Sequence, residues 1–108
     1  MNDLHFQPYA ELHGWLSAQH PGLKTFKTLQ HKLALLAADH PEQRAMCRLL
    51  GGIIGSYVWE FEEAPLPTAT ADRAYRRLLR SLSEIDCTVE PAKQLGNLNR
   101  LAGLVLAE

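Results

Sequence analysis

The most apolar stretch of the chain runs from Pro41 to Glu63 and reads PEQRAMCRLLGGIIGSYVWEFEE. Its large apolar side chains recur every three or four residues, which is the spacing of an amphipathic helix. At about 100° per residue they cover roughly half of a helical circumference. They are Met46, Leu49, Leu50, Ile53, Ile54, Tyr57, Val58 and Phe61. A helix this apolar must contact several neighbours, so we expect it to be the central element of the fold.

One alternative to a helix exists at the end of this stretch. From Tyr57 to Glu62 aromatic residues occupy alternate positions, a pattern that also fits a β-strand. A single strand needs a partner, and no second strand pattern is found elsewhere in the sequence. The periodicity therefore favours a helix here.

Four further helices are predicted around the central one. They span about Pro8 to Gln19, about Leu23 to Ala38, from Thr70 or Ala71 to about Ile85, and from Pro91 onward. An irregular linker over 64–70 contains two prolines. The expected buried faces are Leu12, Trp15, Leu16 and Gln19; Phe26, Leu29, Leu33, Leu36 and Ala37; Tyr75, Leu78, Leu79, Leu82 and Ile85; and Leu95, Leu98, Ala102 and Val105. The predicted fold class is all-α, a compact bundle of four to five helices forming a single domain over 1–108.

Composition narrows the functional classes. A formal charge of −1 produces no global field that would attract nucleic acid or a membrane. Cys47 and Cys87 form no disulfide framework or C-x-x-C pair, and we expect both to be small buried residues in a reducing compartment. The first residues lack the pattern of a signal peptide, and the longest apolar run, 33–38, is too short to span a membrane. These features predict a soluble cytoplasmic protein.

Histidines are common metal ligands and catalytic groups. All five lie in the first forty residues: His5, His13, His20, His31 and His40. His13 and His20 are seven residues apart, whereas two ligands on one helix need a spacing of three or four. The sequence also shows no Ser/His/Asp order and no paired buried carboxylates. We therefore expect no metal, no cofactor and no catalytic residue, and a protein that is not an enzyme.

The strongest surface signal is a run of arginines in the fourth helix. Arg73, Arg76, Arg77 and Arg80 fall opposite its apolar face, where they repel one another and only Glu84 offers local relief. One interpretation is a solvated face paired with carboxylates elsewhere, for example Glu60, Glu62 and Glu63. The others are a site for an acidic protein partner or for nucleic acid phosphates. We predict a non-enzymatic accessory or regulatory protein that binds another macromolecule through these arginines, and we favour a protein partner over nucleic acid. The alternative is a small regulator that binds nucleic acid.

A second surface is predicted on the second helix, where Lys24, Lys27, His31 and Leu35 face away from the core. An exposed histidine beside lysines resembles the arrangement of histidine phosphotransfer domains, in which the imidazole accepts a phosphoryl group. The lysine-glycine pair that follows the histidine in that family is missing here. The third residue after His31 is Ala34, and the small residue that admits a receiver domain in that family is not matched. Leu35 and Leu104 both lie off the apolar faces of their own helices, which makes them candidates for a self-association surface. We therefore expect a homodimer.

Three glycines lie within the predicted third helix. Gly51, Gly52 and Gly55 each cost about 1 kcal/mol relative to alanine in a helix, so they require a reason. No phosphate-binding loop motif accompanies them. We expect a groove of small residues that allows close packing of a neighbouring helix, with a helix kink or a ligand contact as alternatives.

Overall fold

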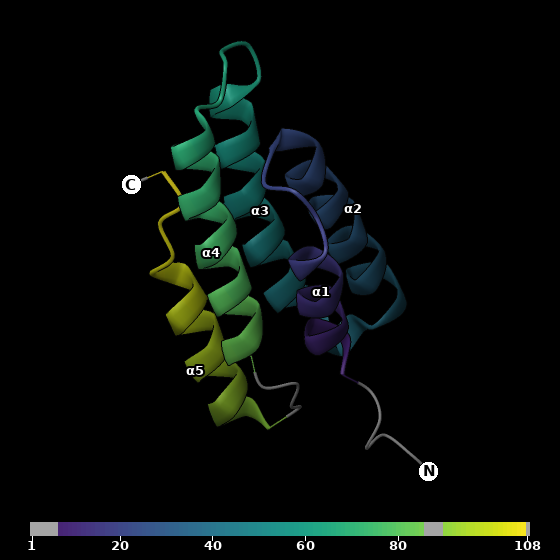
Figure 1. Ribbon diagram of the computed structural model, residues 1–108. Coiled ribbons are helices and arrows are strands. Elements are labelled where there is room, and N and C mark those ends of the chain that lie inside the picture. Colours follow the sequence, from purple (N-terminus) through teal and green to yellow (C-terminus); the bar gives the residue numbers. More distant parts are fainter. Residues whose placement is uncertain (1–6, 86–89, 108) are drawn as a thin grey trace.

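The computed structural model describes residues 7–85 and 90–107, and in this part of the chain it contains α-helices and one 3₁₀ turn but no strand (Figure 1). The elements are α1 (Pro8–Ser17), α2 (Leu23–Asp39), the 3₁₀ turn η2 (Pro41–Gln43), α3 (Arg44–Phe61), α4 (Thr68–Glu84) and α5 (Pro91–Ala102). The all-α prediction is confirmed. The strand alternative for Tyr57–Glu62 is wrong, because α3 continues to Phe61.

The predicted linker over 64–70 is too long at its C-terminal end. Pro67 has extended backbone angles, φ −59° and ψ 142°, and its carbonyl accepts the Ala71 N–H at 2.9 Å. Pro67 is therefore the N-cap, and α4 already begins at Thr68.

α2 and α3 form the most extensive helix pair, α1 packs on α4, and α5 packs on α3 (Figure 1). The largest fully buried side chains include Leu16, Phe26, Leu50, Ile54 and Leu78. In α1 to α4 the predicted apolar residues are buried in the core or partly buried against it. Burial of this apolar surface is what holds the helices together.

The face predicted for α5 is wrong except at Leu98, which packs partly buried against the core. Leu95 and Val105 are 58% and 47% exposed, whereas Asn97 and Leu101 are each only 3% exposed. Leu104, expected to be off the buried face, packs partly buried against the core. The helix ends at Ala102, so the residues after it no longer follow a helical stripe.

Two further expectations can be placed. Cys47 is buried, with 2% of its surface exposed, whereas Cys87 lies outside the described residues. Within the residues that the structure describes, no helix has the length and apolar character needed to cross a membrane.

Candidate functional site

The four predicted arginines lie on α4, and we refer to Arg73, Arg76, Arg77 and Arg80 as the arginine face. Opposite them, Ala71, Ala74, Leu78, Ser81 and Leu82 are buried. Arg73, Arg76 and Arg80 are exposed, whereas Arg77 is partly buried. The amphipathic pattern of α4 thus holds three guanidinium groups in solvent along one side of a helix.

Local charge relief comes from a residue that the sequence analysis overlooked. Asp72 accepts a hydrogen bond from Nε of Arg76 at 2.8 Å, an i,i+4 ion pair. Glu84, expected to relieve Arg80, makes no ion pair within the described part of the chain; its backbone carbonyl instead accepts a hydrogen bond from Arg100 at 3.0 Å. Glu84 is the last residue of α4, and Ile85 after it has extended backbone angles.

The carboxylates at the end of α3 do not form ion pairs with the arginine face in residues 7–85 and 90–107. Glu62 instead binds Nζ of Lys27 in α2 at 2.6 Å. Glu60 and Glu63 are exposed. In the described residues, the arginine face therefore has one ion pair, between Arg76 and Asp72.

Arg77 has a different environment from the other three arginines. Its Nη1 donates a hydrogen bond to the backbone carbonyl of Val105 at 2.9 Å. The chain after α5 is held here, with Leu106 buried and Val105 half exposed beside Arg77. Arg77 therefore supports the C-terminal segment at the backbone of Val105.

Tyr57 links α3 to the start of α4, close to the arginine face. Its hydroxyl donates a hydrogen bond to the carbonyl of Thr70 at 3.3 Å, and Thr70 Oγ1 accepts one from Arg73 at 3.5 Å. Burial raises the pKa of Tyr57, and the nearby Arg73 and Arg77 charges act in the opposite direction.

The second predicted surface comes from α2 alone. Lys24, Lys27 and His31 are exposed, and Leu35 is 52% exposed. An open hollow of about 420 Å³ is lined by Lys24, Lys27, Thr28 and His31. Lys27 is bound to Glu62, so one of the two lysines beside His31 is already paired. No residue from another helix lines this hollow in the described structure, which leaves it shallow.

Close packing at the glycines occurs at one position only. A Cβ atom on Gly55 would lie 2.6 Å from Nε2 of Gln30 in α2, whereas Cβ atoms on Gly51 and Gly52 would meet nothing within 4 Å. The expectation of close helix packing at Gly51 and Gly52 is therefore wrong. An open groove of about 260 Å³ lies there, lined by Gln30, Leu33, Ala34, Ala37, Cys47, Arg48, Gly51 and Gly52.

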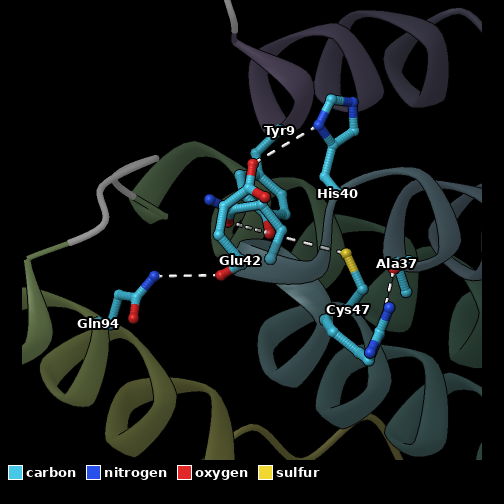
Figure 2. Close-up of polar contacts among 8 residues, drawn as sticks. Tyr9, Ala37, His40, Glu42, Cys47 and Gln94 are labelled. Atoms are coloured by element: carbon cyan, nitrogen blue, oxygen red, sulfur yellow. Dashed lines mark hydrogen bonds and ion pairs between the residues drawn. The ribbon is translucent and has the colours of Figure 1, made fainter.

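A buried polar cluster at the turn between α2 and α3 was not predicted (Figure 2). The Tyr9 hydroxyl donates to Oε1 of Gln43 at 2.8 Å and lies 3.7 Å from Sγ of Cys47. Nδ1 of His40 lies 3.5 Å from Oε2 of Glu42. Its buried members satisfy one another, which indicates that the cluster holds α1 against the turn. The sequence signal was Gln43, a polar residue in the first turn before an apolar helix.

Among the described residues, no three or more His, Cys, Asp or Glu side chains gather closely enough to hold a metal ion; His5 lies outside them. Trp59 is 82% exposed at the end of α3, the most exposed of the large apolar side chains described. Its position opposite the apolar stripe of α3 was a signal that the sequence analysis did not use.

Comparison with protein-family models, with curated protein sequences and with solved structures finds no match for this chain.

Proposed function

We propose that this protein is a non-enzymatic accessory or regulatory module that binds an acidic surface of another protein through the arginine face. The observation that supports the proposal is that Arg73, Arg76 and Arg80 are exposed on one side of α4. Within the described residues, the one carboxylate that forms an ion pair with them is that of Asp72, which binds Arg76. Arginine is enriched at protein interfaces and can bind a carboxylate through two parallel hydrogen bonds.

The spacing of these arginines suggests the form of the partner. Arg73, Arg76 and Arg80 lie three and four residues apart, so they occupy successive turns of α4. A partner helix that carries carboxylates at the same spacing presents its charges at matching intervals. The expected ligand is therefore an acidic, helical protein segment.

Two features favour protein over nucleic acid. The net charge of −1 produces no global field that would attract a nucleic acid. Val105, which is 47% exposed, accepts the Arg77 hydrogen bond through its backbone carbonyl, and protein interfaces combine apolar and arginine contacts. Nucleic-acid binding through the same arginines is the alternative.

We also propose that the protein acts as a homodimer. The described chain exposes several large apolar side chains, among them Leu35 at 52% and Trp59 at 82%. Exposed groups of this kind are typical of surfaces that become covered on association.

The test uses a double charge reversal, Arg73→Glu with Arg80→Glu. Arg76 is kept, because a glutamate there would face Asp72. The control is Lys24→Glu with Lys93→Glu, which changes the net charge by the same amount as the arginine double variant but at positions on α2 and α5.

The probes are a labelled synthetic helical peptide with glutamates at positions i, i+3 and i+7, and labelled duplex DNA of arbitrary sequence. Charge-assisted contacts contribute about 1.5–3 kcal/mol each, so we expect the arginine double variant to bind the peptide at least about tenfold more weakly. The control should bind like the wild type.

Salt dependence separates the two partner classes. Binding to DNA would show log K falling with log[salt] by about one unit for each phosphate contacted, independently of sequence. Binding to a protein segment should show a shallower dependence, mainly in the association rate. Affinity capture from the native host, identified by mass spectrometry, should then recover acidic proteins with the wild type and the control but not with the arginine double variant. Equal binding by all three forms would contradict the proposal.

A further inference from the structure

The outer side of α3 carries an aligned set of exposed residues. Arg48, Gly52, Ser56 and Trp59 are all exposed, and successive members are three or four residues apart. At 3.6 residues per turn, they share one side of the helix within about 80°. We call these four residues the α3 outer face. It combines a tryptophan that is 82% exposed with small residues along the same line.

The small residues border an open groove and do not pack closely against a neighbouring helix. The groove of about 260 Å³ between α2 and α3 is lined by Gly51 and Gly52, and a Cβ atom at either position would meet nothing within 4 Å. An apolar cavity of about 150 Å³ holds a benzene molecule, so this groove can receive an indole ring. Trp59 cannot occupy the groove of its own chain, because it lies about two helical turns from Gly52 on the same side of α3.

We propose that two copies of the chain pack α3 against α3 in an antiparallel manner, each inserting its Trp59 into the groove beside Gly52 of the other. The proposal rests on the homodimer proposed above but not on the arginine face. In an antiparallel pair related by a two-fold axis, the position of the axis determines which residues face one another. An axis between positions 55 and 56 places Trp59 opposite Gly52, and the exposed Ser56 of each copy lies beside the axis.

The same register also brings opposite charges together at both ends of the helix pair. With the axis between positions 55 and 56, the position of Arg48 in one copy matches that of Glu63, in the turn directly after α3, of the other, and the pair occurs twice. Both side chains are exposed, and in residues 7–85 and 90–107 neither forms an ion pair within its own chain. Arg48 also lines the groove, where its guanidinium can lie against the inserted indole. Shape and charge complementarity therefore agree on one register.

Other occupants fit this surface less well. Small-molecule pockets have volumes of about 300–1,000 Å³ and enclose most of the ligand, whereas this groove is smaller and open along one side. A foreign partner would have to supply both a group that fills the groove and a surface that covers Trp59. A second copy covers both features at once.

The first measurement is the molecular mass of the full 108-residue chain by sedimentation equilibrium over a range of concentrations. We expect a reversible dimer with twice the 12.1 kDa mass of the chain. Trp59→Ala should raise the dimer dissociation constant at least about tenfold, because a central tryptophan is a common hot spot. Leu95→Ala is the matched control, since Leu95 is 58% exposed on α5, and it should leave the constant unchanged.

Two further variants test the register. Gly52→Leu fills the groove without a clash of its Cβ in the isolated chain, so it should prevent dimerisation while the monomer stays folded by circular dichroism. Arg48→Glu should weaken the dimer, and Arg48→Glu combined with Glu63→Arg should restore it. A monomeric wild type, an unchanged constant for Trp59→Ala or Gly52→Leu, or no recovery in the charge swap would overturn the proposal. Binding of the acidic peptide is measured separately, and a monomeric protein that still binds it would leave the arginine-face proposal standing.

Discussion

Gly55 of α3 lies so close to Gln30 of α2 that a Cβ atom on the glycine would be 2.6 Å from Nε2 of the glutamine. The nearest atom is the end of a flexible side chain, so a methyl group can be accommodated if Gln30 rotates. A larger side chain must displace the whole Gln30 side chain and crowds the contact between α2 and α3. This contact is therefore a sharp test of the packing between the two most extensively paired helices.

Gly55→Leu should destabilise the fold by about 1–3 kcal/mol, the usual cost of overpacking. Gly55→Ala should change the stability much less, because the gain in helix propensity offsets the displacement of Gln30. Gly96→Ala in α5 is the control: its Cβ would meet nothing within 4 Å, and it should stabilise by up to about 1 kcal/mol. Urea unfolding followed by circular dichroism measures all three. An unchanged midpoint for Gly55→Leu would show that this face of α3 is open.

Tyr9→Phe should destabilise the fold by about 1–3 kcal/mol. The substitution removes the hydroxyl that donates to Oε1 of Gln43 at 2.8 Å, and Gln43 is only 2% exposed, so its amide oxygen loses this partner in a buried site. Combining Tyr9→Phe with Gln43→Leu should recover part of the loss, because both polar groups are then removed. A double-mutant cycle by chemical unfolding gives the coupling energy, and a value near zero would contradict this role of the pair.

Alkaline pH should destabilise the protein through Tyr57. Its pKa is raised in the folded state, mainly by burial, above the ordinary value of 10.0. The folded state therefore holds the phenol proton more tightly than the unfolded state does. The resulting stabilisation is complete below pH 10 and is lost as the pH rises from there through the folded pKa. Tyr57→Phe should flatten this part of the stability curve above pH 10, measured by urea unfolding at several pH values. A curve of unchanged slope would contradict the assignment.

His31→Ala should change the free energy of unfolding by no more than about 0.5 kcal/mol, because the side chain is exposed on α2 and lines only a shallow hollow. Incubation of the wild type with a low-molecular-weight phosphodonor should leave His31 unmodified. An acid-labile phosphoryl group on His31, absent from the alanine variant, would favour phosphotransfer over the proposed binding function.

The sequence by itself determined the helices and most of their buried faces. Phe26, Leu33, Leu50 and Leu78 are fully buried as their spacing predicts, because helical periodicity places them on one side of each helix whatever the neighbours are. The exposure of Arg73, Arg76 and Arg80 follows from the same periodicity in α4. Asp72 could have been recognised as well, since it precedes Arg76 by four residues.

Only the tertiary structure decided which surfaces meet. Arg77 has the same spacing as its neighbours, yet it donates to the carbonyl of Val105 because the chain folds back after α5. Gly52 and Gly55 look alike in the sequence, but α2 brings Gln30 against one and leaves a groove beside the other. These differences depend on how far apart two helices lie and how their axes cross. Periodicity within one helix determines which side faces inward, but it carries no information about the distance to the helix that covers it.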